Sequence, residues 1–122
     1  DSFNQEVFGR ALDNARQHGT RISVVHDVAE AVAGADVVYT DEWASTGFFD
    51  ERQARIEAYR GFTITNEVMK HAKPDAIYMH PLPADRDIEV TSAVMDGPNS
   101  VVFDQAENRL HAQKGVMALT MA

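Results

Sequence analysis

The sequence predicts an α/β fold, a doubly wound parallel sheet with helices on both faces. Three observations carry this prediction. Short segments rich in β-branched side chains alternate with segments of helical periodicity, turn residues separate them, and no repeat or low-complexity tract interrupts the alternation. At 122 residues the chain is long enough to form one compact domain with a buried core.

The first element is predicted to be a helix. Ser2 and Gln5 have the spacing of a reciprocal N-terminal cap, and Gly19 can end the helix in the left-handed conformation. Apolar residues recur every three or four positions between these ends and form one stripe, made of Phe3, Val7, Phe8, Leu12 and Ala15. We expect this stripe to pack against another part of the protein.

A strand, a short helix and a second strand are predicted next. Residues 21–26 (RISVVH) are short and β-branched, which is typical of a strand. Asp27 is a favourable N-cap for a helix that runs to Val32, and Gly34 closes that helix. Residues 36–40 predict the second strand.

Two helices are predicted in the middle of the chain. Residues 51–59 are highly charged and indicate a surface helix, whose inward contacts would be Ile56 and Tyr59. Thr65 is a good cap for the next helix, over residues 66–72.

The last third of the chain contains four more elements. Residues 76–80 (AIYMH) predict a buried strand, 91–95 a short helix, 99–103 a last strand and 105–121 the final helix. Four strand candidates are few for a doubly wound sheet, so we expect its first strand to lie before Asp1. The absence of an initiator methionine supports the same expectation of a truncated chain.

Composition argues against several classes of function. The net charge is -8 and the eleven Lys and Arg form no basic stripe, so nucleic acid is not an expected partner. No segment reaches the ~20 apolar residues of a membrane helix. The absence of cysteine excludes disulfides and thiolate metal sites and favours a cytoplasmic location. The five histidines lack metal-ligand spacing, so no metal site is predicted.

The first candidate site follows the strand at residues 36–40. Ligands of an open parallel sheet bind beyond the carboxyl ends of its strands, and here the chain reads YTDEWASTG. Asp41 can accept hydrogen bonds from an ammonium group, and Ser45 can both donate and accept. The alternative is that both side chains satisfy the backbone of their own turn. Trp43 is more typical of a packing residue.

The second candidate site is HPLPADR, which follows the strand at residues 76–80. Two prolines bracket Leu82 and remove two amide donors, so the carbonyl oxygens of Pro81 and Leu82 are free to accept hydrogen bonds from a small planar amide. We predict a cis peptide bond between Leu82 and Pro83. The alternative is a strand-ending turn without a ligand.

Arg109 is the third candidate, early in the final helix. If its guanidinium points into the crevice, it can hold a phosphate or carbonyl oxygen and stabilise developing negative charge. The alternative is a surface salt bridge with Asp104 or Glu107.

Three segments in this order, YTDEWASTG, HPLPADR and VVFDQAENRLHAQKGVMALTM, resemble the second domain of the aspartate and ornithine carbamoyltransferase family, of the ornithine transcarbamylase type. The resemblance covers essentially the whole chain. It implies that residues 1–122 are the amino-acid (ornithine)-binding domain of a two-domain carbamoyltransferase, whose final helix crosses to the other domain. It also implies transfer of the carbamoyl group from carbamoyl phosphate to the side-chain amine of ornithine or a close analogue, giving citrulline in arginine biosynthesis, without a cofactor.

The resemblance also assigns the amine-binding residues. Asp41 and Ser45 would hold the amino acid, with Thr46 beside them, and Asp41 would be one of two catalytic residues. Thr46 stands where the ornithine loop of the family usually has Met. The aspartate branch reads its substrate with arginine, whereas this loop is acidic, so an amine-bearing substrate is favoured.

On the carbamoyl side, the carbonyls of Pro81 and Leu82 would contact the amide nitrogen. Arg109, the other catalytic residue, would contact the carbamoyl oxygen. Pro81 stands where ornithine enzymes usually have Cys, and the aspartate branch has Pro there.

Family members form homotrimers that share active sites between subunits, and their phosphate-binding Ser-Thr-Arg-Thr loop lies in the first domain. These residues contain no such loop, so the fragment alone is expected to be inactive. The alternative from another class is a non-catalytic structural or regulatory module that retains the fold.

Overall fold

A parallel pair of strands forms the centre of the molecule. The structure is a computed structural model that describes residues 4–44, 47 and 49–121. Strand β1 (Val37–Tyr39) pairs with β2 (Ile77–Met79), and Val38 lies opposite Tyr78. Parallel strands require a long crossover, which the helices between β1 and β2 provide. The predicted α/β class with a parallel sheet is confirmed.

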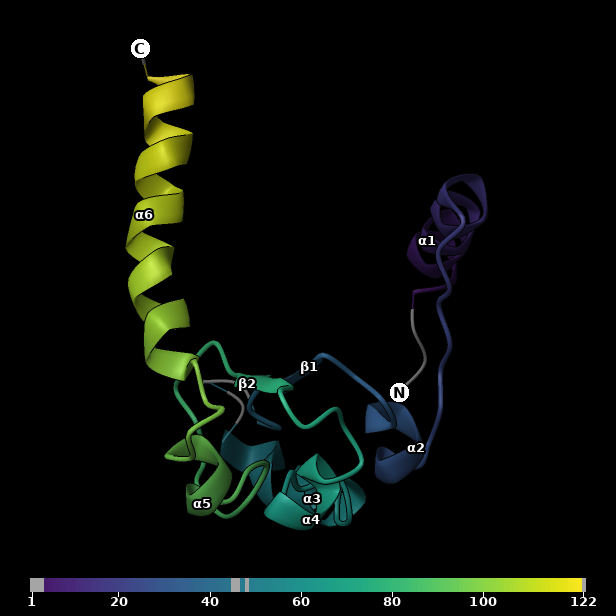
Figure 1. Ribbon diagram of the computed structural model, residues 1–122, viewed down its shortest axis with the longest axis vertical. Helices are drawn as coiled ribbons and strands as arrows, with labels where there is room; N and C mark the ends of the chain where they lie inside the picture. The colour runs from purple at the N-terminus through teal and green to yellow at the C-terminus, as the bar shows by residue number, and fades with distance from the viewer. Residues whose placement is uncertain (1–3, 45–46, 48, 122) are drawn as a thin grey trace.

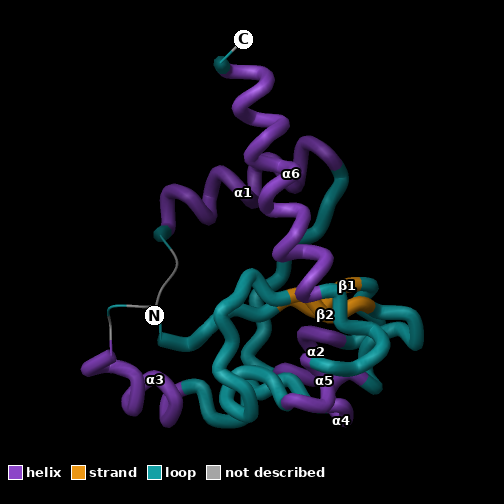
Figure 2. The backbone as a smooth tube through the Cα atoms, turned by 90° about the vertical axis from the view of Figure 1, so that its left-hand side faces the viewer, coloured by secondary structure: helices purple, strands orange, loops and turns teal. Residues whose placement is uncertain are grey.

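Three short helices pack on one side of the strands: α2 (Val28–Val32), α4 (Asn66–Met69) and α5 (Ser92–Met95) (Figure 1). A further helix, α3 (Arg52–Ala58), follows a 3₁₀ turn (Phe49–Glu51) and lies beside this layer (Figure 2). The buried core lies between the strands and these helices and contains Val32, Val38, Ile64, Ala72, Ala76, Tyr78, Val90, Val94, Met95 and Val102.

The two longest helices, α1 (Gln5–His18) and α6 (Val102–Thr120), lie on the other side of the strands (Figures 1 and 2). Phe3 of the predicted apolar stripe lies outside the described residues. Among the described residues of the stripe only Ala15 is buried, and Val7 is 62% exposed. On α6, Leu119 is 87% exposed. Both helices therefore present uncovered apolar side chains to solvent. In the described ranges, none of the helices combines the length and the apolarity needed to cross a membrane.

The predicted helix caps are largely confirmed. The side chains of Asp27 and Thr65 each accept a hydrogen bond from the backbone N–H three residues later, and Gly19 ends α1 with φ 66°. The N-cap of α1 is Asn4, whose side chain caps a helix as well as a serine does. The predicted cap Ser2 lies outside the described residues.

The strand predicted at residues 21–26 is not formed. This segment connects α1 to α2 without regular structure, and Ile22 and Val24 are exposed. A strand is stabilised by hydrogen bonds to a neighbouring strand, and none of the described residues pairs with this segment. Its β-branched composition alone is not sufficient to form a strand.

The strand predicted at residues 99–103 is also wrong. Ser100 forms a single parallel bridge to Tyr78, through hydrogen bonds from Tyr78 N to Asn99 O at 2.9 Å and from Val101 N to Tyr78 O at 3.0 Å. The chain then enters α6 at Val102, earlier than predicted. Entry into the helix limits this contact to one residue and places the first turns of α6 beside β2.

Candidate functional site

The carboxyl ends of β1 and β2 open at the same edge of the sheet, because the two strands are parallel. The backbone stays paired just past the strands, where Thr40 N donates to Met79 O at 3.3 Å. We refer to residues 40–44, residues 80–85 and the first turns of α6, residues 102–109, as the C-terminal rim.

Gln105 attaches α6 to both strands at this rim. Its Oε1 accepts a hydrogen bond from His80 N at 3.0 Å, and its Nε2 donates to the hydroxyl of Tyr39 at 3.1 Å. The amide therefore connects the first turns of α6 to β1 and to the residue that follows β2. Gln105 is not among the site residues predicted from the sequence.

Arg109 lies four residues after Gln105, which places the two side chains on the same face of α6. It is exposed, and it forms neither an ion pair nor a hydrogen bond with any residue that the structure describes. The alternative predicted for it, a salt bridge with Asp104 or Glu107, is therefore not observed. Its guanidinium remains available to a ligand.

Asp41 follows β1 at the rim and is exposed. Its Oδ1 accepts a hydrogen bond from Glu42 N at 2.8 Å, so part of the carboxylate supports its own turn, as the alternative interpretation proposed. The other two residues predicted in this loop, Ser45 and Thr46, lie outside the described residues. Trp43 packs against Tyr59 with ring centroids 5.7 Å apart, which agrees with a packing role.

An ion pair joins the segments that follow the two strands. Arg52 Nη2, at the start of α3, lies 2.9 Å from Asp85 Oδ2, at the end of the HPLPADR turn. Each side chain is 40% exposed, so solvent weakens the attraction and the pair contributes more to the position of the loops than to stability.

The HPLPADR turn has the predicted backbone. The peptide bond between Leu82 and Pro83 is cis, as predicted. Leu82 has φ 57°, in the left-handed region that a leucine rarely adopts. No residue in the described ranges donates a hydrogen bond to the carbonyl oxygen of Pro81 or of Leu82. Both oxygens are therefore available as acceptors.

Two buried polar side chains lie behind this turn. His80 and Glu89 are both 0% exposed, and His80 Nε2 lies 3.3 Å from Glu89 Oε1. His80 Nδ1 accepts a hydrogen bond from Leu82 N at 3.0 Å, and Glu89 Oε1 accepts one from Asp85 N at 2.5 Å. Burial raises the pKa of Glu89, and the hydrogen bond from the backbone N–H of Asp85 partly opposes that effect.

Tyr78 occupies the centre of the core and contacts the end of β1. Its hydroxyl lies 2.6 Å from Thr40 Oγ1, which gives the buried phenol hydroxyl a hydrogen-bonding partner. Burial raises the pKa of Tyr78 to about 12. The phenol is therefore neutral at physiological pH and acts as a structural hydrogen-bonding group.

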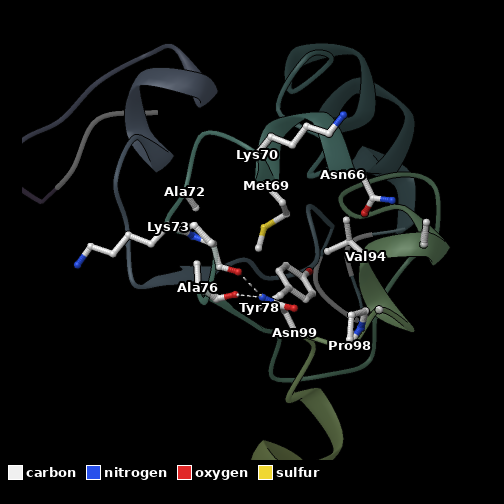
Figure 3. Close-up of a pocket in the computed structure, with 13 residues that line it drawn as sticks. Asn66, Met69, Lys70, Ala72, Lys73, Ala76, Tyr78, Val94, Pro98 and Asn99 are labelled. Atoms are coloured by element: carbon white, nitrogen blue, oxygen red, sulfur yellow. Dashed lines mark hydrogen bonds between the residues drawn. The ribbon is translucent and has the colours of Figure 1, made fainter.

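A cavity of about 570 Å³ lies between α4 and α5 (Figure 3). Met69, Ala76 and Val94 form apolar parts of its wall, and the side chains of Lys70 and Lys73 extend away from it. None of the described residues predicted in the site lines this cavity. Among the residues that the structure describes, no group of three or more His, Asp or Glu could hold a metal ion.

Asp41 and the turn at residues 81–85 thus follow the two parallel strands at the same edge of the sheet, and Gln105 joins the first turns of α6 to that edge. Sequence reasoning missed His80 and Glu89 as partners of the turn. A weak signal was present, because Glu89 is an acidic residue between Ile88 and Val90, where a buried strand-like segment would have an apolar side chain.

The sequence matches the family model for "Aspartate/ornithine carbamoyltransferase, Asp/Orn binding domain" over residues 2–120. It is 54% identical to an ornithine carbamoyltransferase of Methanothermobacter thermautotrophicus, over 93% of this chain and 36% of the relative. It is 56% identical to that of Thermococcus kodakarensis, over 95% of this chain and 37% of the relative. The chain therefore spans little more than a third of the length of these relatives.

The fold is similar to solved structures as well. The ornithine carbamoyltransferase from Pyrococcus furiosus superimposes with a TM-score of 0.88 and 51% sequence identity, and the match covers 97% of this chain and 38% of that one. The similarity in sequence and the similarity in structure therefore lead to the same group of proteins.

Proposed function

Because this chain belongs to the aspartate/ornithine carbamoyltransferase family, we propose that it is the amino-acid-binding domain of an ornithine carbamoyltransferase. The reaction would transfer the carbamoyl group of carbamoyl phosphate to the side-chain amine of ornithine. A bond forms between the amine nitrogen and the carbonyl carbon, the bond to the phosphate oxygen breaks, and the nitrogen loses a proton. The products are citrulline and phosphate.

The observation that carries the proposal is the composition of the C-terminal rim. It combines an exposed carboxylate, two carbonyl oxygens without donors among the described residues, and an exposed guanidinium without an ionic partner among them. These groups match a substrate pair that contains an amine, an amide nitrogen and a polarised carbonyl oxygen. The relatives that match this chain carry the name ornithine carbamoyltransferase, which agrees with that chemistry.

On the amine side, Asp41 would accept charge-assisted hydrogen bonds from an ammonium group of ornithine and so orient the reacting amine. Ser45 and Thr46 would contact the same molecule. Part of the Asp41 carboxylate already accepts a backbone hydrogen bond, which fixes its direction before the substrate arrives.

On the carbamoyl side, the carbonyl oxygens of Pro81 and Leu82 would accept hydrogen bonds from the NH₂ of carbamoyl phosphate. Arg109 would hold the carbamoyl oxygen, where negative charge develops as the amine attacks. The protein would then act by orientation and charge stabilisation, with the uncharged amine as nucleophile.

The remaining parts of the proposal concern the whole enzyme. Its relatives are longer than this chain, and we propose that the other segments supply most of the phosphate contacts. A homotrimer, a cytoplasmic location and a role in arginine biosynthesis complete the proposal. Sedimentation of the full-length protein would test the trimer.

The decisive experiment is an assay of the full-length enzyme with carbamoyl phosphate and four acceptors: ornithine, putrescine, N-acetylornithine and aspartate. We expect ornithine to give the highest kcat/KM. Preference for aspartate would contradict the role of Asp41, because a carboxylate at that position repels an acidic substrate. Activity with none of the acceptors would favour the non-catalytic module.

A further inference from the structure

The backbone of the HPLPADR turn is held from behind by His80 and Glu89. His80 Nδ1 accepts the N–H of Leu82 at 3.0 Å, and Glu89 Oε1 accepts the N–H of Asp85 at 2.5 Å. The two buried side chains thus fix both ends of the segment that carries the carbonyl oxygens of Pro81 and Leu82, which have no donor in the part of the chain that the structure describes. Leu82 has an unfavourable positive φ, which its surroundings must impose.

These contacts also determine which nitrogen of His80 carries the proton. Because Nδ1 accepts a hydrogen bond from Leu82, a neutral His80 has its proton on Nε2. Nε2 faces Glu89 Oε1 at 3.3 Å, and this oxygen, which already accepts the N–H of Asp85, favours the tautomer with its proton on Nε2. This contact is longer than a well-formed hydrogen bond, and neither Nε2 nor Glu89 Oε2 has a hydrogen-bond partner in the described part of the chain.

We propose that Glu89 is a positioning residue, which holds His80 in the Nε2-protonated tautomer and thereby keeps the turn at Pro81 and Leu82 aligned as the acceptor of the carbamoyl amide. The proposal rests on the function proposed above. Glu89 does not touch the substrate in this scheme. Its effect passes through His80 to Leu82 N and through Asp85 N to the end of the turn.

The cost of burying Glu89 supports a role beyond stability. Its carboxyl is fully buried, and burial raises its pKa, so the folded state favours the protonated form. The contribution of this group to stability is present below the pKa of an unfolded Glu, and it is lost as the pH rises through the higher folded value. At neutral pH an amide residue of similar volume, whose oxygen can still accept the N–H of Asp85, would therefore be tolerated at least as well by the fold.

Glu89→Gln in the full-length enzyme tests the proposal, with Glu67→Gln as the matched control because Glu67 is exposed and pairs only with Lys70 among the described residues. The introduced amide can turn its NH₂ toward Nε2 of His80, so that the ring proton moves to Nδ1. The Nδ1–H and the N–H of Leu82 would then be two donors that face each other. We expect kcat/KM for carbamoyl phosphate to fall about 10- to 100-fold, the range typical of orienting partners. The KM for ornithine should not rise, and the midpoint of thermal unfolding should not fall.

Substitutions of His80 provide an independent test. In His80→Asn the side-chain oxygen can replace Nδ1 as acceptor for Leu82 N, whereas in His80→Gln the polar group lies near the position of Nε2. We expect the Asn variant to retain about tenfold more activity than the Gln variant, the size of one orienting contact. Equal activities, or a higher activity for the Gln variant, would overturn the proposal.

The remaining outcomes are also distinct. If Glu89→Gln lowers activity only in proportion to a fall in the unfolding midpoint, Glu89 has a purely structural role and the proposal fails. If the parent enzyme transfers no carbamoyl group, the proposed function fails instead. In that case ¹⁵N NMR of the histidine rings still tests the arrangement. We expect a protonated Nε2 in the parent and a changed tautomer in Glu89→Gln, and an Nδ1-protonated ring in the parent would refute it.

Discussion

Arg52 Nη2 lies 2.9 Å from Asp85 Oδ2, so two residues 33 positions apart connect the segments that follow β1 and β2. The same Asp85 donates its backbone N–H to Glu89. The ion pair on the surface and the buried carboxylate therefore hold the end of the HPLPADR turn from two sides. Substitution of Arg52 therefore tests whether the ion pair sets the relative position of the two loops at the C-terminal rim.

Arg52→Gln should affect substrate binding more than folding. Removal of a half-exposed ion pair is expected to lower the free energy of unfolding by about 1 kcal/mol or less. The loop that carries Asp41 would lose its connection to the turn, so the KM for ornithine should rise several-fold. Arg55→Gln removes the exposed pair with Glu51 in the same helix and serves as the control. Equal KM values in the two variants would contradict this role.

Asp41→Asn should weaken binding of the amine in the full-length enzyme. Loss of a charge-assisted hydrogen bond costs about 1.5–3 kcal/mol, or about a 10- to 100-fold rise in the KM for ornithine. The KM for carbamoyl phosphate should change little. Asp50→Asn, at an exposed position nearby in the sequence, is the control. An unchanged KM for ornithine would exclude the proposed role of Asp41.

Gln105→Ala should destabilise the junction between α6 and the strands. The substitution leaves the N–H of His80 without its acceptor, at an expected cost of about 1–3 kcal/mol in the free energy of unfolding. Denaturant unfolding of the parent and the variant measures this difference. Gln113→Ala, at an exposed position on the same helix, should change stability by less than about 0.5 kcal/mol. Similar losses in both variants would show that the bridge is not important for stability.

Tyr78→Phe should remove part of the alkaline pH dependence of stability. Burial raises the pKa of Tyr78 to about 12, while an unfolded tyrosine titrates near pH 10. The folded state therefore retains a proton that the unfolded state releases, and the parent loses stability as the pH rises from about 10 toward 12, by up to about 2–3 kcal/mol.

The phenol of Tyr78 faces the hydroxyl of Thr40, and the charge of Glu89 raises its pKa further. The difference in unfolding free energy between parent and Tyr78→Phe should therefore shift in favour of the variant between about pH 10 and 12, from the pKa of an unfolded tyrosine to that of Tyr78 in the folded protein. A constant difference over this range would show that Tyr78 titrates normally.

Local chemistry in the sequence was sufficient for several features. The caps at Asp27 and Thr65 and the left-handed stop at Gly19 depend on a few neighbouring residues, and the structure confirms all three. The cis bond before Pro83 was predicted for the same reason, from two prolines around one leucine after a strand. Such features are predictable because the interacting groups lie within about one turn of chain.

The two wrong strand predictions concern segments whose structure depends on distant partners. Residues 21–26 have a strand-like composition, but strand hydrogen bonds go to another segment, and no described residue supplies them. Residues 99–103 form only one bridge before α6 begins. In both cases β propensity was correct as a local preference and insufficient as a prediction of structure.

The sequence by itself determined the α/β class, the helix caps at Asp27 and Thr65, and the position of Asp41 and the HPLPADR turn after two parallel strands. Only the tertiary structure decided that Gln105 connects α6 to both strands, that Arg109 has no ionic partner among the described residues, and that His80 and Glu89 are buried behind the turn. The physical reason is the range of the interactions. Caps and turns form between residues a few positions apart, whereas burial and the pairing of polar groups depend on segments that folding brings together.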